Sequence, residues 1–339
     1  MKRLSSLLLA AVAASALLAG PAAADTSDKK IALSNNYAGN SWRQAMLKSW
    51  ETVTSAAVGS GVVAKADAFT TAENQATEQA AQIQNLILQG YDAIVINAAS
   101  PTALNGAIKE ACDAGIVVVS FDGIVTEPCA WRIAVDFKKM GSIQLDYLHE
   151  RLPEGGNLLE IRGLAGVFVD DEIHAGINEG LAKHDKFKVT GSVHGDWSQE
   201  VAQKAVAGIL PSQPEIVGVV TQGGDGYGAA EAFKAADRPT PIIIMGNRQD
   251  ELLWWKQQKD ANGYETMSVS IAPGVSTLAF WVAQQILDGK EVPKDLVVPF
   301  LQITQDTLEE NLAKTEPGGV ANVEYSLDDA IAVIEAASK

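Results

Sequence analysis

GYDAIVIN, residues 90–97, and AGIVVVSFD, residues 114–122, are the stretches that decide the fold. Each carries a glycine followed by a short β-branched run and ends on a polar residue. This pattern predicts strands at Ala93–Asn97 and Ile116–Asp122, buried in a parallel sheet. Ser100-Pro101 lies between them and predicts a crossover helix with proline at its first position. The two blocks therefore predict a strand-helix-strand unit, from which parallel sheets are built.

The same alternation extends in both directions from this unit. Ser41 followed by Gln44 predicts a capping box at the start of a helix. Further strands are predicted at Ile31–Ser34, Val62–Ala66, Asn157–Gly163, Val189–Val193, Ile216–Thr221, Ile242–Asn247 and Met267–Ile271. Further helices are predicted at Glu73–Gln89, Lys138–Arg151, Asp170–His184, Gln199–Leu210, Gly226–Ala236, Asp250–Gln258, Val275–Leu287 and Leu327–Ala337. The pattern is typical of the α/β class.

Two successive series of similar length predict two similar Rossmann-like lobes, each with a parallel sheet. We expect an N-terminal lobe of residues 25–133 plus about 272–300, and a C-terminal lobe of residues 134–271 plus about 301–339. The boundary near Ile133–Asp136 has no linker composition, which favours hinge strands that absorb a rotation between the lobes.

The N-terminus has the order of a secretory signal. Lys2 and Arg3 precede an apolar run, and three alanines end at Ala24. We expect cleavage after Ala24 and a periplasmic protein without direct membrane insertion. An uncleaved anchor is the alternative, although the run is short for a membrane span.

Charge and cysteine content restrict the function further. Without residues 1–24 the chain has 24 basic and 42 acidic residues, a net charge of −18, which disfavours binding to nucleic acid. Cys112 and Cys129 are the only cysteines. In an oxidising compartment an even pair favours a disulfide over a metal site, with two buried free thiols as the alternative. No metal site and no cofactor are predicted.

Polar and aromatic residues follow the predicted strands. Ligands of open α/β sheets sit outside the carboxyl ends of the strands, where hydroxyl groups can bind Asp, Asn and Arg while sugar rings pack on aromatic side chains. Taken singly, Trp42 could be helix-start packing and Asn35-Asn36 a simple turn. Their recurrence at many strand ends favours a sugar site.

Other chemistries fit the sequence less well. Gly223–Gly228 lacks the GxGxxG spacing of a nucleotide loop and follows a late strand. Asp170-Asp171-Glu172 could act as acid and base in a glycosidase, but acidic residues at a helix start ordinarily interact with the helix dipole. The sequence has no GxSxG, HExxH or CxxC motif.

These residues together resemble the type I periplasmic sugar-binding family, in particular its ribose-binding and galactofuranose-binding branch. The resemblance covers essentially the whole chain after residue 24 and depends on the order and spacing of several weak matches. The matching stretches are Ile31–Asn36, Trp42-Arg43, Gly90–Asn97, Ala114–Asp122, Asn157–Gly166, Val219–Asp225 and Ile242–Asn247.

The resemblance implies a hinged receptor that holds a sugar between its lobes for the permease of an ATP-driven (ABC) importer. The predicted ligand-binding residues are Asn36, Tyr37, Asn40, Trp42, Arg43, Asn97, Phe121, Asp122, Phe168, Asp171, Trp197, Gln222, Asp225 and Asn247. The sequence departs from the ribose-type pattern at Gly123 and Asp171, where the family has arginines, and at Gly223-Gly224, where it has Asn-Asp. A sugar other than ribose, or a polyol, is therefore expected.

We expect a monomer that binds a monosaccharide or polyol without reacting with it. A sugar-sensing receptor for chemotaxis or signalling would use the same cleft, so one chain does not distinguish it from a transport protein. A secreted carbohydrate-active enzyme is a more remote alternative. A DNA-binding regulator with similar lobes is disfavoured because no helix-turn-helix precedes Ile31.

Overall fold

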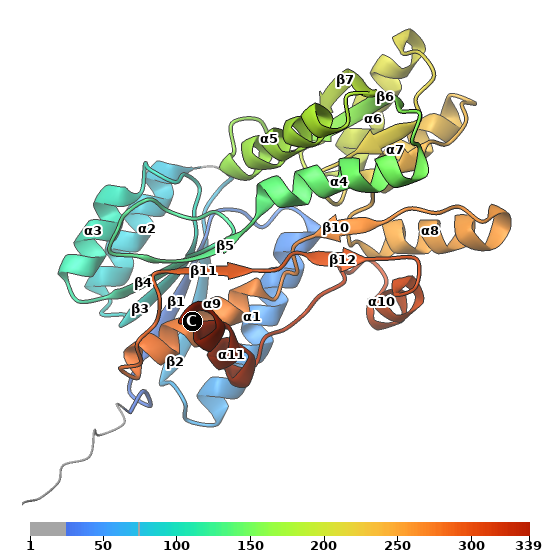
Figure 1. The fold of residues 1–339 in the computed structure, drawn as a ribbon. Coiled ribbons are helices and arrows are strands. Elements are labelled where there is room, and N and C mark those ends of the chain that lie inside the picture. Colours follow the sequence, from blue (N-terminus) through green and yellow to red (C-terminus); the bar gives the residue numbers. More distant parts are fainter. Residues whose placement is uncertain (1–24, 74) are drawn as a thin grey trace, which may run out of the picture.

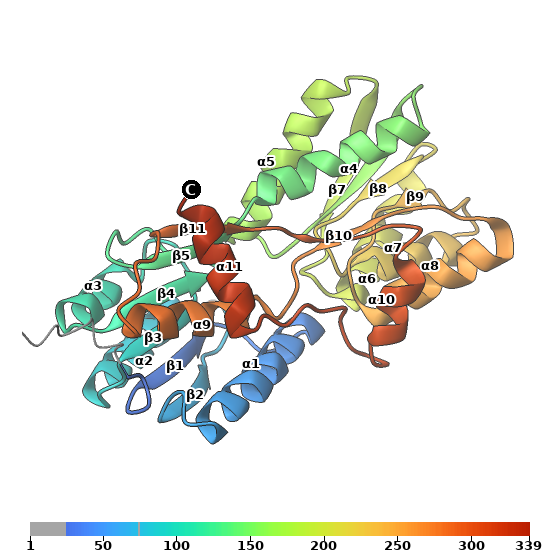
Figure 2. The same cartoon turned by 60° about the horizontal axis from the view of Figure 1, so that its bottom comes forward.

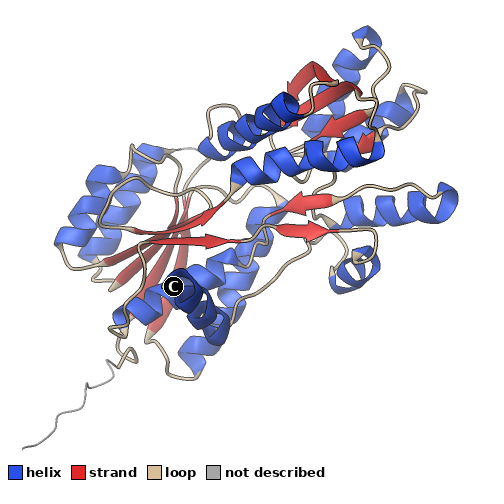
Figure 3. Ribbon diagram, viewed as in Figure 1, coloured by secondary structure: helices blue, strands red, loops and turns tan. Residues whose placement is uncertain are grey.

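Two α/β lobes make up the part of the chain that the computed structural model describes, residues 25–73 and 75–339 (Figure 1). The predicted secretory signal, residues 1–24, lies outside the described residues. The predicted class, two lobes with parallel sheets, is confirmed. Figure 3 shows the two sheets as separate groups of strands with helices around each.

A six-stranded parallel sheet forms the first lobe, in the order β11-β5-β4-β3-β1-β2. Its strands are β1 (Lys30–Asn35), β2 (Lys65–Thr70), β3 (Ala93–Asn97), β4 (Val117–Phe121), β5 (Trp131–Val135) and β11 (Asp295–Val298). Its helices are α1 (Ser41–Gly59), α2 (Ala76–Leu88), α3 (Asn105–Asp113), α9 (Val275–Leu287) and α11 (Leu327–Ala337). The order reverses between β1 and β3, so a crevice opens at their carboxyl ends.

Strand alternation explains why this sheet is covered on both faces. Ile31 and Leu33 of β1 belong to the cluster packed under α1 and α9, whereas Ala32 belongs to the cluster under α2 and α3. Because both faces are buried, the strands are apolar at successive positions rather than at alternate ones. The apolar run from Val275 to Ala283 is buried throughout for the same reason, since α9 lies between the sheet, α1 and α11.

The second lobe has a four-stranded parallel sheet in the order β7-β6-β8-β9. Its strands are β6 (Gly156–Arg162), β7 (Phe187–His194), β8 (Gly218–Val220) and β9 (Ile242–Ile243), with β10 (Ser268–Ser270) and β12 (Leu301–Ile303) as a separate antiparallel pair. Its helices are α4 (Phe137–Arg151), α5 (Phe168–Lys183), α6 (Gln199–Ile209), η1 (Leu210–Ser212), α7 (Gly226–Ala235), α8 (Gln249–Asn262) and α10 (Leu308–Lys314).

The chain passes between the lobes four times. Three crossings are the connections from β5 to α4, from β10 to α9 and from β11 to β12, which Figure 1 shows side by side at the junction. The fourth, residues 315–326, runs from α10, which packs on α8, to α11, which packs on α9 and β11 (Figure 2). Several short connections of this kind allow the lobes to rotate about a common hinge.

The lobe ranges predicted from the sequence differ from this arrangement at two places. β5 pairs with β4 and β11, so the first lobe continues through Val135 instead of ending at residue 133. Leu327–Ala337, which the sequence places in the C-terminal lobe, packs on the first lobe, because the apolar face of α11 covers α9.

Several element ends also differ from the predictions, as three examples show. The second strand begins at Lys65 and not at Val62. Asn40 caps α1 in place of Ser41, because the Asn40 Oδ1 accepts a hydrogen bond of 2.9 Å from the Arg43 N–H. The helix predicted from Pro101 starts at Asn105, after turns in which the Pro101 carbonyl accepts from the Thr126 N–H.

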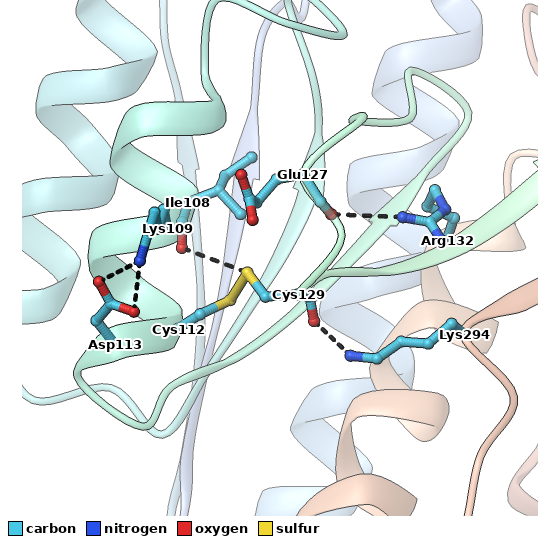
Figure 4. The surroundings of a disulfide bond; sticks show 8 residues. All are labelled: Ile108, Lys109, Cys112, Asp113, Glu127, Cys129, Arg132 and Lys294. Carbon is cyan, nitrogen blue, oxygen red and sulfur yellow. Dashed lines mark hydrogen bonds and ion pairs between the residues drawn. A yellow bond between two sulfur atoms is a disulfide. The ribbon is translucent and has the colours of Figure 1, made fainter.

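Cys112 and Cys129 form a disulfide, as predicted, which joins the end of α3 to the loop before β5 (Figure 4). Their Cα atoms are 6.4 Å apart and their sequence separation is 17. Lys294, which precedes β11, donates a hydrogen bond to the Cys129 carbonyl. The bridge therefore ties α3 to the edge of the sheet where β5 and β11 pair.

Candidate ligand-binding cleft

A cavity opens between the lobes at the carboxyl ends of the strands. Its empty volume, counted to its open mouth, is about 870 Å³, which is within the range of small-molecule sites. The lining includes ten of the predicted ligand-binding residues: Asn36, Tyr37, Asn40, Trp42, Arg43, Asn97, Asp122, Trp197, Gln222 and Asn247. It also includes Glu73, Ala98, Gly123, Phe137, Met140, Leu164, Val167, Val169, Ile173, Gly223, Gly224, Arg248, Ser270 and Ile271.

Asp122 is the centre of a polar cluster on the first lobe. It directly follows β4 and has a φ of 56°, a left-handed conformation that Asp tolerates better than most residues. Its Oδ2 accepts a hydrogen bond of 2.8 Å from Asn97 Nδ2 and lies 3.3 Å from Arg43 Nη2. β3, β4 and the first turn of α1 thus bring three polar side chains together.

Burial affects both the ionisation and the hydrogen bonding of this cluster. It raises the pKa of the Asp122 carboxyl and lowers that of the Arg43 guanidinium, while the attraction between the two opposes both shifts. Arg43 Nη1 and Asn36 Oδ1 are buried without a hydrogen-bond partner among the described residues. Because buried polar atoms are almost always paired, this donor and this acceptor favour a polar ligand in the cavity.

Trp42 links the two sides of the cleft. Its Nε1 donates a hydrogen bond of 2.8 Å to the Ile271 carbonyl, which lies after β10 at one of the crossings. The Arg43 guanidinium lies 5.1 Å from the centre of the Trp42 ring, a cation–π distance. The indole is therefore held in place before any ligand arrives.

Trp197 and Arg248 are in contact on the second lobe. Trp197 has a φ of 52° and packs so closely on Gly163 that a Cβ there would come within 2.3 Å of the indole. Arg248 donates hydrogen bonds to the carbonyl oxygens of Trp197 and Gly224. Arg248 thus holds the backbone on which the Trp197 ring depends.

Gln222 lines the cleft but uses both ends of its amide within the lobe. Its Nε2 donates to the Asp170 carbonyl at 3.0 Å and to the Asp170 Oδ1 at 2.8 Å, and its Oε1 accepts from the Gly163 N–H at 3.0 Å. Asn247 Nδ2 likewise donates to the carbonyls of Ala321 and Ile271, so only the Asn247 Oδ1 remains available to a ligand.

Four predicted residues lie outside the lining. Phe121 is fully buried in the core under α9, because its side chain points to the opposite face from that of Asp122. Phe168 packs against the same core from the start of α5. The Asp171 side chain is 66% exposed and contacts Arg162 at 3.1 Å. Asp225 is buried inside the second lobe.

Sequence reasoning missed several lining residues. Arg248 and Gly223 adjoin predicted positions, so inspecting one more residue at each strand end would have found them. The apolar residues Phe137, Met140, Val167, Val169 and Ile173 carried no signal, because in sequence they read as the buried face of a helix.

Asp225 caps α7 without a side-chain hydrogen bond, and neither of its oxygens has a partner among the described residues. Burial raises its pKa well above the ordinary value of 3.8; Arg248 opposes the shift, and Glu251 and Asp196 add to it. Since the pKa is higher in the folded state, the stability linked to its proton is complete below about pH 3.8 and is lost as the pH rises through the folded-state pKa.

We therefore expect Asp225→Asn to raise the free energy of unfolding at pH 7.5 by about 1–3 kcal/mol, and by little at pH 4. Urea unfolding at both pH values measures the difference. Asp185→Asn, at an exposed position, is the matched control and should change stability equally little at each pH. A variant less stable than the parent at pH 7.5 would contradict the expectation.

Comparison with known proteins identifies the family to which a chain with this cleft belongs. The model of a family described as "Periplasmic binding protein domain" matches residues 31–291. The chain belongs to this family. A solved structure of a protein from Thermobispora bispora, described as an ABC transporter solute binding protein, is 34% identical in sequence. The two structures superpose with a TM-score of 0.86 over 92% of this chain and 96% of the other.

Two curated proteins are similar to the chain at lower sequence identity. A xylitol-binding protein of Mycolicibacterium smegmatis is 27% identical over 246 residues, 71% of this chain and 69% of the relative. A ribose import binding protein of Bacillus subtilis is 25% identical over 239 residues, 69% of this chain and 75% of the relative. The predicted resemblance to sugar-binding proteins of ABC importers is thereby confirmed at the level of the family.

Two further observations concern the described residues only. Within residues 25–73 and 75–339 no helix combines the length and the apolar character that crossing a membrane requires. In the same ranges, no group of three or more His, Cys, Asp or Glu side chains is arranged to hold a metal ion.

Proposed function

We propose that this periplasmic binding protein holds a monosaccharide or polyol in the cleft between its lobes and delivers it to the permease of an ABC importer. One observation carries the proposal: an unpartnered buried donor, Arg43 Nη1, and an unpartnered buried acceptor, Asn36 Oδ1, border one cavity beside Asp122. Neighbouring hydroxyl groups can accept from the first and donate to the second. Relatives named for xylitol and ribose support this ligand class.

The residues proposed to bind the ligand are those that line the cavity. Asp122, Asn97, Asn36 and Arg43 hydrogen-bond its hydroxyl groups, and Asn247 Oδ1 adds an acceptor from the second lobe. Trp42 and Trp197 contact its carbon skeleton. Because these groups come from both lobes, a ligand contacts all of them only when the cleft is shut, so binding shifts the protein to its closed form.

The remaining parts of the proposal concern the setting. Residues 1–24 direct export and are cleaved off after Ala24. The remaining chain acts as a monomer in the periplasm and leaves its ligand chemically unchanged. A micromolar dissociation constant, about −8 kcal/mol, is ordinary for a site of this kind.

Thermal-shift screening of pentoses, hexoses, tetritols and pentitols, followed by calorimetry on the best compound, tests the proposal, since a ligand that binds only the folded state raises the melting temperature. We expect at least one compound to bind with 1:1 stoichiometry and to be recovered unaltered. Failure of the whole panel to bind would refute the ligand class, and conversion of a compound would reveal an enzyme. Gene neighbours that encode a permease and an ATPase would favour transport over signalling.

A further inference from the structure

The two walls of the cleft differ in chemistry. The first lobe contributes the polar cluster around Asp122. The opposite wall, from α4, α5 and the loop before α5, consists of apolar side chains: Phe137, Met140, Leu164, Val167, Val169 and Ile173. Figure 2 shows α4 and α5 side by side on the second lobe, facing the junction.

Side chains that could supply hydrogen bonds from the second lobe are largely occupied. The Gln222 amide is used at both ends, and Asn247 retains only its Oδ1. The Arg248 guanidinium donates to two backbone carbonyls. Two polar side chains of the lining, Asn247 after β9 and Ser270 at the end of β10, do not belong to α4 or α5.

The start of α5 places no charge in the cleft. Asp170, which is fully buried, is held inward by Arg162, and Asp171 is turned out to solvent beside the same arginine. Val167 and Val169 line the cavity, whereas Asp170 and Asp171 do not. A hydroxyl group pressed against this wall would lose its hydrogen bonds to water without replacement, whereas a methyl group would be buried favourably.

Resting on the proposed function, we propose that the ligand is a deoxygenated sugar or polyol. Its hydroxyl groups bind the cluster at Asp122, Arg43 and Asn36, and a carbon without a hydroxyl group, such as the methyl group of a 6-deoxy sugar, packs on Val167, Val169 and Phe137. This arrangement satisfies the unpartnered polar atoms of one wall and leaves no ligand hydroxyl unpaired on the other.

Matched pairs that differ by one hydroxyl group test the inference by calorimetry on the protein without residues 1–24. Suitable pairs are D-galactose with D-fucose, L-galactose with L-fucose, L-mannose with L-rhamnose, and D-ribose with 5-deoxy-D-ribose. In the pair that fits the cluster, we expect the deoxy compound to bind about 10-fold to 100-fold more tightly. Binding confined to the fully hydroxylated compounds, or equal affinity within every pair, would overturn the inference while the proposed function stands.

A substitution in the apolar wall tests whether this wall causes the preference for the deoxy compound. Val169→Thr keeps the side chain's size and adds a hydroxyl group, so it should reduce the affinity ratio of the pair about tenfold. Val201→Thr, on an exposed valine near the start of α6, is the control and should leave the ratio unchanged. An unchanged ratio in Val169→Thr would also overturn the inference. Failure of every pair, together with failure of the whole thermal-shift panel of sugars and polyols, refutes the proposed function itself and the inference with it. Failure of every pair while a fully hydroxylated compound of that panel binds overturns the inference alone.

Discussion

Asp122→Asn is expected to lower the affinity for the best sugar or polyol at least about 100-fold, about 3 kcal/mol. The carboxylate is buried, accepts from Asn97 and pairs with Arg43, so it can bind a ligand hydroxyl through a charge-assisted hydrogen bond. An amide of the same shape loses that charge and leaves the Arg43 guanidinium buried without a counter-ion. Asn also tolerates the left-handed backbone at this position, so the fold should persist.

Calorimetry with the tightest ligand of the screen gives the affinity, and the melting temperature without ligand reports on the fold. Asp113→Asn is the control, because Asp113 is 66% exposed and pairs only with Lys109 one helical turn away. We expect it to leave the affinity within experimental error. If Asp122→Asn bound as tightly as the parent, Asp122 would not be a ligand-binding residue.

The sequence predicted the sheet of the first lobe well because its strands are buried on both faces. Ala93–Asn97 matches its prediction residue for residue, since a β-branched run between a glycine and a polar residue leaves few alternatives. The short elements were harder. The sequence predicts only a lobe boundary where β5 lies, because five residues with an arginine in second place lack the pattern of a buried strand.

The start of α1 shows how local chemistry can mislead. Ser41 and Gln44 have the spacing of a capping box, yet Asn40 immediately before them is an equally good cap. Only the backbone conformation decides between neighbours of this kind, and Asn40 adopts the extended conformation of a cap.

The first-lobe half of the cleft was accessible from sequence because a polar residue ends β3 and polar residues directly follow β1 and β4. The second-lobe half was less so. Gly223 and Gly224, with φ of 87° and 93°, turn the chain so that Asp225 enters the interior, and the sequence alone gives no direction for that turn. Asp171 next to Asp170 presents the same difficulty, since one of two neighbouring carboxylates is buried and the other exposed.

Substitutions of the neighbouring residues Asp170 and Asp171 should have very different effects on stability. Asp170 accepts from Arg162 at 3.1 and 2.5 Å, from the Gly163 N–H at 2.9 Å and from Gln222 at 2.8 Å. Asp170→Asn should lower the free energy of unfolding by about 3 kcal/mol, because it leaves Arg162 without its buried partner and replaces an acceptor with a donor.

Asp171→Asn is the matched comparison, because it removes one exposed contact with the same arginine. We expect it to change the free energy of unfolding by less than about 0.5 kcal/mol and to leave ligand affinity unchanged, since Asp171 lies outside the cleft lining. Urea unfolding and calorimetry on both variants measure the two quantities. Weakened binding in Asp171→Asn would restore this residue to the ligand site. Equal stability of the two variants would show that the Arg162–Asp170 pair does not stabilise the fold.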